Sequence, residues 1–536
     1  MSQVEIAQRS IRGSFALFAG NFLSTIVSFV VILFIARLLG PSNYGVYTLC
    51  VLLPNFLLNF LGFGVSSGIT RYAAYHLSQG QPDDARRMTM TGAIFIMLFG
   101  TALSVLDFLI AGFVATSVFN RPEIAPLLRF SSVFILAQAV FQSGTAALLG
   151  WSYMGKIGIT TIAQSVLRLA IVAPLLLAGY EVYGALVAYA ASVVLGGLLA
   201  YALLWRGMRG TGYSLSGFGR DVATLLSYGR ELFVGALAAN FSAQYVVAIL
   251  AIIASNAYVG YYQSASNFVT AITLTSGAIT QALFPAFAHL GGAGSDVSRA
   301  FRLAVKYMGF AVTPIIFLLM GASLQVIRLP LGPSYSSAAV LLTLLAFSNV
   351  SMLFGTGVLP SFFNGLGRTR YYMLSSVAGA GVVLALAPAL SVVGGLGVYG
   401  LIFSILAANM VVVATGLYLA SRYMNAHVDF RACASILVSS LLAYAATVGV
   451  SMVRAGDYIL LPAEVVVFAA VYLTLAPVAG ALDGEDLDIL SDALSGLGRF
   501  EVVISPVVRY ERFILRVAGR SPLAGSGDLA SSQANS

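Results

Sequence analysis

Arg168 is the charged residue whose position in this sequence most clearly suggests chemistry, because it lies in the middle of an apolar run at 157–178. A charge at the centre of a bilayer costs about 2.5–3.5 kcal/mol even on a lenient insertion scale. Arg168 should therefore face the interior of a helix bundle or a wet cavity. There it could attract an anionic substrate group, or it could pair with a carboxylate such as Asp107 and join two helices.

Asp107 is the clearest carboxylate inside an apolar run. It is a candidate for ion coupling, because a carboxylate at membrane depth can bind a proton or a cation. The alternative is a structural ion pair with Arg168, or with Arg129 nearer the end of the run. We regard the ion pair as the simpler interpretation, since perturbed carboxylates are often structural.

Amide side chains gather in the first apolar runs of each half of the chain. Amides can hydrogen-bond sugar hydroxyls in a wet cleft, but in membranes they also join helices, at about 0.6 kcal/mol each. As a set on corresponding runs they suggest a polar, substrate-binding cavity shared with Arg168. The candidates are Asn21, Asn55, Asn59, Asn240, Gln244, Asn267 and Gln281.

Three arginines, Arg12, Arg71 and Arg230, stand at predicted cytoplasmic ends of apolar runs. Basic residues at such ends anchor helices on the cytoplasmic side. The functional alternative is a patch through which a phosphorylated lipid headgroup reaches the cavity.

Enzymatic chemistry has no visible basis in the sequence. His76, His289 and His427 show neither metal-ligand spacing nor a paired nucleophile. There is no phosphate-binding glycine loop for ATP, and Cys50 and Cys433 fit no disulfide or metal pattern. We expect a protein that is not an enzyme and that needs no cofactor or metal.

The composition identifies the elements that must position these side chains. Hydrophobic residues make up 59% of the chain and charged residues 9%, with a mean hydropathy of +0.92, whereas soluble domains carry about 25% charged residues. We predict an all-α integral membrane protein with about fourteen spans of about 20 residues. They lie roughly at 14–37, 44–69, 89–114, 125–149, 157–178, 182–205, 229–254, 257–284, 303–324, 336–360, 371–391, 397–420, 432–453 and 458–480.

Arginine placement predicts the orientation. The net charge of +8 is concentrated in alternate loops, which is typical of cytoplasmic loops in a multi-pass protein of the cell membrane and not of a nucleic-acid partner. Both termini should therefore lie in the cytoplasm.

An internal repeat divides the predicted spans into halves. Ala173-Pro174 followed by Val182-Tyr183-Gly184 recurs as Ala387-Pro388 followed by Val398-Tyr399-Gly400, roughly 215 residues later. Two parallel six-helix repeats of this kind are related by an axis along the membrane normal and can alternate access to a site between them. The predicted domains are 1–215, 216–425, two additional spans at 426–480 and a partly disordered cytoplasmic tail at 481–536.

A turn motif at 36–47, Ala-Arg-Leu-Leu-Gly-Pro-Ser-Asn-Tyr-Gly-Val-Tyr, separates the first two runs. Gly40 and Pro41 should end the first helix. Tyr44 and Tyr47 are amphipathic aromatics, which are typical of the membrane–water interface. A related turn at 255–262 contains Gly-Tyr-Tyr where the first contains Gly-Val-Tyr.

This turn resembles the signature turn of polysaccharide flippases in the multidrug/oligosaccharidyl-lipid/polysaccharide (MOP) exporter superfamily. The segment 364–370, Asn-Gly-Leu-Gly-Arg-Thr-Arg, is similar to an inner-loop pattern of the same family. The resemblance implies a V-shaped pair of six-helix lobes that moves a polyprenyl-(pyro)phosphate-linked oligosaccharide from the cytoplasmic to the outer leaflet. In relatives a cationic cavity holds the phosphates, a role that Arg168 and the helix-end arginines could serve here.

Other functions stay open at this point. An ion-coupled multidrug exporter of the same superfamily should carry acidic cavity groups, which are scarce in these spans, and a lipid II flippase is a variant of the first interpretation. A membrane-embedded glycosyltransferase would need catalytic carboxylates on large outer loops, and the loops are short. The expected partners are the lipid-linked oligosaccharide and the bilayer, with coupling to a proton or cation gradient and contact with glycan-assembly proteins as further possibilities.

Overall fold

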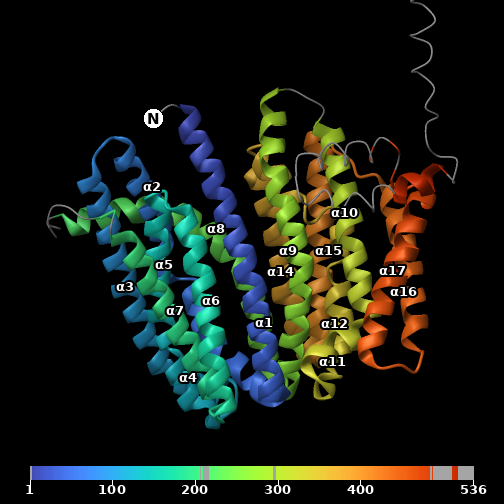
Figure 1. Ribbon diagram of the computed structural model, residues 1–536, viewed down its shortest axis with the longest axis horizontal. Helices are drawn as coiled ribbons and strands as arrows, with labels where there is room; N and C mark the ends of the chain where they lie inside the picture. Colours follow the sequence, from blue (N-terminus) through green and yellow to red (C-terminus); the bar gives the residue numbers. More distant parts are fainter. Residues whose placement is uncertain are drawn as a thin grey trace, which may run out of the picture. The chain divides into compact units, whose positions relative to one another are not determined.

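The computed structural model describes residues 3–205, 207–208, 217–293, 297–482, 484, 486 and 510–516. Side chains are described in these ranges except at 3–16, 18, 229–243 and 291–293. Every regular element in the described residues is helical (Figure 1). The predicted all-α fold is therefore confirmed.

Within the described residues up to Ala479, seventeen α-helices follow one another. Their bounds are α1 Gln3–Leu58, α2 Val65–Ser78, α3 Pro82–Phe113, α4 Ala125–Ser131, α5 Val133–Gly150, α6 Met154–Leu177, α7 Glu181–Trp205, α8 Phe218–Ile253, α9 Asn256–Ala293, α10 Val297–Gly321, α11 Ser323–Leu331, α12 Ala338–Phe347, α13 Leu359–Gly365, α14 Thr369–Pro388, α15 Gly397–Met424, α16 Phe430–Ser451 and α17 Asp457–Ala479. Short 3-10 or π segments connect several of them, at Leu61–Gly64, Val114–Val118, Pro122–Ile124, Pro333–Tyr335, Val350–Phe354 and Ala389–Val393. A short helix at 510–516, called here the tail helix, follows them.

Twelve helical segments of the described chain are long and apolar enough to cross a membrane. The first of them, Ala19–Leu58, covers most of the first predicted span and much of the second. In α8 the described apolar part, Gln244–Ile253, is too short to count although the helix itself is longer. The twelve segments are therefore compatible with about fourteen spans, since a span needs about 20 residues.

The predicted turn coincides with a break in α1. Gly40 has φ 71° and ψ 169°, so the helix ends there and a second one begins at Pro41. In Figure 1, α1 runs away from the N-terminus and α2 lies back at the end where the chain starts. The chain thus reverses near Gly40, a left-handed position that glycine adopts at little cost.

The two tyrosines of the turn do not lie where the sequence suggested. Tyr44 is 3% exposed and Tyr47 is 7% exposed, so the prediction that they face the membrane–water interface is wrong. Both rings lie inside the bundle, because their hydroxyls have buried polar partners, described below.

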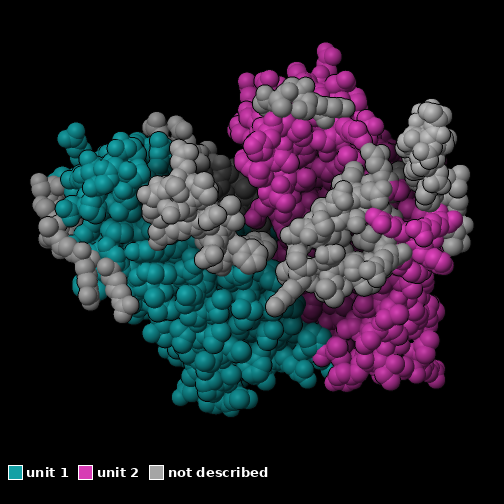
Figure 2. Space-filling model, turned by 45° about the horizontal axis from the view of Figure 1, so that its top comes forward, with its two compact units in different colours: residues 1–267, 330–337, 383–401 teal, residues 268–329, 338–382, 402–536 magenta. Residues whose placement is uncertain are grey.

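The described chain forms two compact units (Figure 2). Unit 1 contains residues 1–267, 330–337 and 383–401, and unit 2 contains 268–329, 338–382 and 402–536. These units group the chain differently from the predicted repeats, because residues 216–267 and the short segments 330–337 and 383–401 pack with the N-terminal unit. The division into 1–215 and 216–425 stays a prediction.

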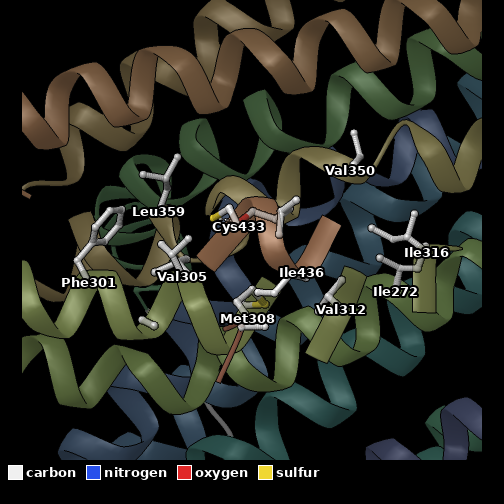
Figure 3. Packing of buried hydrophobic residues seen from close by; sticks show 14 of the residues in the cluster. Ile272, Phe301, Val305, Met308, Val312, Ile316, Val350, Leu359, Cys433 and Ile436 are labelled. Carbon is white, nitrogen blue, oxygen red and sulfur yellow. Dashed lines mark hydrogen bonds between the residues drawn. The ribbon is translucent and has the colours of Figure 1, made fainter. Parts of the chain in front are cut away.

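Unit 2 has an extensive aromatic and aliphatic core. Phe362 lies between Phe301 and Phe287, with ring centroids 4.4 and 5.3 Å away. Figure 3 shows Phe301 and Leu359 in the same cluster as Met308 and Ile436. Lipid tails are as apolar as these side chains, so close packing rather than removal from water holds such helices together.

Candidate functional site

Arg168 lies on α6 and is buried, with 8% of its surface exposed. Its guanidinium donates a hydrogen bond from Nη2 to the Tyr47 hydroxyl of α1 at 2.7 Å. The same guanidinium lies 4.9 Å from the ring centre of Tyr189 on α7. An aromatic face attracts a cation through its quadrupole, so Arg168 is held by a phenol oxygen and a ring face.

Close packing of α1 against α6 positions Arg168. Gly20 lies so near Gly158 that a Cβ on Gly20 would overlap the Gly158 backbone. One to two turns further along, the Ser165 hydroxyl contacts those of Ser24 and Ser28 at 2.7 and 3.0 Å. Small residues and hydroxyl contacts of this kind are typical glue between membrane helices, and Arg168 follows Ser165 on the same helix face.

The contacts of Arg168 continue from α1 to α9. Tyr47 stacks on Tyr44 with ring centroids 6.1 Å apart, and the Tyr44 hydroxyl accepts a hydrogen bond from Asn267 at 2.9 Å. Gln263 in turn donates to the Asn267 amide oxygen at 3.2 Å. We call this set of residues, Arg168, Tyr189, Tyr47, Tyr44, Asn267 and Gln263, the Arg168 network. It joins α1, α6, α7 and α9 within unit 1.

Arg168 and Asn267 are predicted site residues, whereas the tyrosines and Gln263 that connect them were not predicted. The available signal was the spacing of Tyr44 and Tyr47, three residues apart in a helix, which places both on one face. Their amphipathic rings suggested the membrane–water interface, whereas their hydroxyls form hydrogen bonds inside the bundle.

Asp107 has no ion pair in the described part of the chain. It is fully buried on α3, and neither carboxylate oxygen has a hydrogen-bond partner there. The expected pair with Arg168 is therefore absent, and so is the pair with Arg129, whose guanidinium lies over the Phe108 ring at 6.0 Å. A lone buried charge is costly, and no described side chain offsets one at Asp107.

The Arg168 guanidinium consequently has no neutralising carboxylate among the described residues. Its Nε is also buried without a hydrogen-bond partner there. A guanidinium has five N–H donors, and Tyr47 accepts from one nitrogen. Among the described residues the positive charge is therefore not neutralised, and the Nε–H donor is unpaired.

Most of the other predicted amides stay outside this network. Asn59 donates to carbonyl oxygens of its own helix, those of Asn55 and Phe56, at 3.1 and 3.2 Å. Asn21 and Gln281 are exposed, whereas Asn55 and Gln244 are half-buried. The side chain of Asn240 lies outside the described residues.

Among the helix-end arginines, the structure describes the side chain of Arg71 alone. Arg71 is exposed on α2 and stacks over the Tyr228 ring at 4.3 Å and near the Tyr72 ring at 5.9 Å. The side chains of Arg12 and Arg230 lie outside the described part of the structure.

Three side chains tie segments distant in sequence through main-chain carbonyls, all within unit 1. Arg121 donates to the carbonyl of Ala251 at 2.6 Å and also to that of Ala254, the last carbonyls of α8. Arg37 donates to the carbonyl of Pro330 at 3.2 Å. The Tyr335 hydroxyl donates to the Ala36 carbonyl at 2.6 Å. All lie in or beside the predicted outer loops, and we call them the three side-chain ties.

Comparison with known proteins gives one family match. The profile of a family described as "Polysaccharide biosynthesis protein" matches residues 10–290. That range is more than half of the chain and includes the turn at Gly40, Asp107 and the whole Arg168 network. A search of curated proteins found no significant match.

Solved structures with a similar fold are membrane transporters. The chain resembles a lipid II flippase, MurJ, in an inward closed conformation, with a TM-score of 0.70 and 13% identity over 86% of this chain and 98% of that one. It also resembles an inward-facing multidrug resistance transporter of the MOP superfamily, at a TM-score of 0.60 and 16% identity over 75% and 94% of the two chains. A MOP superfamily transporter from Pyrococcus furiosus matches at 0.54 and 17% identity, over 78% and 95%. The predicted MOP-type fold is confirmed.

Proposed function

Since this chain belongs to the polysaccharide biosynthesis protein family, we propose that it is a flippase for a polyprenyl-(pyro)phosphate-linked oligosaccharide. The substrate passes from the cytoplasmic to the outer leaflet of the cell membrane. In this proposal both termini are cytoplasmic and the repeats 1–215 and 216–425 alternate access to the substrate.

The observation that supports this function is the uncompensated charge of Arg168. Its contacts with described side chains are a phenol oxygen and an aromatic face, so it attracts an anion rather than a cation. Guanidinium groups bind phosphate through two parallel N–H···O bonds. A (pyro)phosphate reaching α6 would find a positive charge already desolvated by its surroundings, where its attraction is stronger than in water.

The polar neighbours of Arg168 suit the remainder of such a substrate. The Tyr47 hydroxyl accepts from the guanidinium, and the Tyr44 hydroxyl and the Asn267 amide follow it in the Arg168 network. These groups can exchange hydrogen bonds with sugar hydroxyls next to the phosphate. Stacked aromatic rings also offer flat faces to a sugar ring.

Alternating access requires contacts that break at one end of the molecule. In our proposal the three side-chain ties, and Arg121 above all, keep the predicted outer end closed. Each tie is a side-chain bond to a carbonyl, so it can open without unwinding a helix. Coupling to a proton gradient would in this proposal use Asp107, the buried carboxylate of α3 that has no hydrogen-bond partner among the described residues.

Flipping of a labelled polyprenyl-pyrophosphate oligosaccharide in proteoliposomes tests this function. The wild-type chain should flip it, Arg168→Lys should retain part of the rate, and Arg168→Ala should lose it while remaining folded by its melting curve. Lipid II and a cationic dye serve as comparison substrates. Transport of the dye alone would overturn the proposal in favour of a multidrug exporter, and normal flipping by Arg168→Ala would remove Arg168 from the mechanism.

A further inference from the structure

The tail helix lies beside a membrane-spanning helix rather than beyond its end. The Tyr510 hydroxyl contacts that of Thr474 at 2.8 Å, and Thr474 lies inside the candidate span Asp457–Ala479. In Figure 1 the tail helix, in red, lies against one end of α17. It is therefore at the depth of the last turns of that span.

One face of the tail helix packs against the rest of unit 2. Glu511 and Leu515, four residues apart, are each 2% exposed, and residues with this spacing share a helix face. Leu515 packs with Leu482 against Tyr307 and Phe310 of α10.

An ion pair secures the chain next to Leu482. Asp486 accepts a hydrogen bond from Lys306 at 2.5 Å and another from the Tyr307 hydroxyl at 2.9 Å. Both charged side chains are buried, so removing either one would leave the other as an uncompensated buried charge. The tail is thus attached to α10 at this pair and to α17 at Thr474.

The opposite face of the tail helix is exposed and has a different composition. Tyr510 is 40% exposed and Phe513 is 60% exposed, and Arg516 is exposed as well. Their spacing of three residues places them in one stripe. Two aromatics followed by an arginine are typical of a helix that lies in the headgroup layer of a membrane.

We propose that the tail helix is an interfacial anchor whose Tyr510–Phe513–Arg516 stripe lies in the headgroup layer and binds anionic phospholipids. Its depth beside Thr474 brings the stripe to lipid, and Arg516 supplies the charge that is complementary to an anionic headgroup. The stripe itself contains no carboxylate, and Glu511 points to the protein side. The anchor fixes α10 and α17 to the membrane surface through Asp486 and Thr474.

This inference does not depend on which substrate the protein transports. A tail that only covers the protein, or that binds a water-soluble partner, would leave Phe513 in water. A tail in the headgroup layer places Phe513 among lipids. The two cases differ in whether a lipid or an aqueous quencher can reach the side chain at position 513.

The experiment uses the full chain with Trp205→Phe, which removes the exposed native indole that lipid or iodide could quench. Trp151 is kept, because it is buried and donates to Thr89. Phe513→Trp then reports on the stripe in vesicles of phosphatidylglycerol and phosphatidylcholine containing lipids brominated near the headgroup. The control is Gln79→Trp, at an exposed turn between α2 and α3. We expect the indole introduced by Phe513→Trp to emit at shorter wavelength than the one introduced by Gln79→Trp, and to be quenched at least twofold more by the brominated lipid.

The preference of the stripe for anionic phospholipids is tested by a second variant, Arg516→Gln. Lipid quenching of the Phe513→Trp protein should be stronger in phosphatidylglycerol than in phosphatidylcholine, and adding Arg516→Gln should abolish that difference. Quenching of the same indole by aqueous iodide but not by brominated lipid would overturn the anchor. Equal quenching in both lipids, unchanged by Arg516→Gln, would overturn the anionic preference. Unchanged melting curves show that the variants are folded.

Discussion

Gly45 of α1 and Gly260 of α9 pack directly against each other, backbone to backbone, within unit 1. A Cβ on Gly45 would lie 3.1 Å from the Gly260 nitrogen, and a Cβ on Gly260 would lie 3.2 Å from the Gly45 nitrogen. The same added atoms would overlap the carbonyl oxygens of Asn256 and Pro41. These glycines are also the positions that the predicted repeat equates. A two-fold relation between equivalent residues would bring them together at its axis, and the repeat itself stays a prediction.

Gly45→Ala and Gly260→Ala should both destabilise the protein. An added methyl group meets backbone atoms that cannot rotate away, and overpacking typically costs about 1–3 kcal/mol. Thermal melting in detergent measures the loss. Gly277→Ala on α9 is the matched control, because a Cβ there meets nothing within 4 Å. Equal melting temperatures for all three variants would contradict this close contact.

Arg121→Ala should loosen the end of α8. The substitution leaves the last carbonyls of that helix without their cationic donor, an interaction worth about 0.3–1 kcal/mol at an exposed helix end and up to about 2 kcal/mol when partly buried. Amide exchange over residues 251–260 should therefore become faster. Hydrogen-exchange mass spectrometry on the reconstituted protein measures the change.

Arg129→Ala is the control for Arg121, since Arg129 has the same charge on the same predicted side but lies over Phe108. Its exchange pattern over 251–260 should match that of wild type. If Arg121→Ala also matches wild type, the tie contributes nothing to closure and the outer end is held by packing alone.

Docking of the tail helix should depend on pH through Glu511. Burial raises the pKa of the Glu511 carboxyl from its ordinary value of 4.5 to about 7. The docked state then holds a proton that the undocked state releases, so docking is strongest below about pH 4.5 and weakens as pH rises through about 7. The titratable groups nearby are Tyr472 of α17, with Lys306, Tyr307 and Asp486 at the α10 contact.

Glu511→Gln should remove this pH dependence and keep the tail docked above pH 7, because the amide is neutral throughout. Limited proteolysis of the tail between pH 5 and 9 measures docking. The wild-type tail should be cut faster at the upper end of this range and the variant should not. A wild-type cleavage rate that does not change with pH would exclude Glu511 as the controlling group.

The sequence predicted the spans well because hydropathy is a local property, and α3, α6 and α17 each follow from one apolar run. The partners of single side chains were harder to predict. Tyr47 has the amphipathic side chain of an interfacial residue, yet its position is decided by Arg168, far away in sequence. Arg121 has no recognisable signal, because its partners are main-chain carbonyls that any residue type could supply. Asp107 suggested an ion pair through charge alone, and the helix packing does not bring a partner to it.

Substitutions of Arg168 and Asp107 should affect the stability of the protein independently of each other. Arg168→Ala removes a charged hydrogen bond to Tyr47, for which about 1.5–3 kcal/mol is typical. Asp107→Asn should cost little, because the carboxylate that it replaces has no hydrogen-bond partner among the described residues. Since the two residues share no partner, their effects on the free energy of unfolding should add within about 0.3–0.5 kcal/mol in the double variant.

Denaturant unfolding of the wild type, the two single variants and the double variant measures these free energies as a double-mutant cycle. If the two charges were paired in the membrane, each single variant would leave an orphan charge and lose about 3–5 kcal/mol, and the double variant would recover most of it. Recovery of that size would contradict the arrangement described here. Tyr47→Phe adds a second check, because it removes the acceptor of Arg168 and leaves the ring. It should destabilise the wild type by about 1 kcal/mol and have little effect in the Arg168→Ala background.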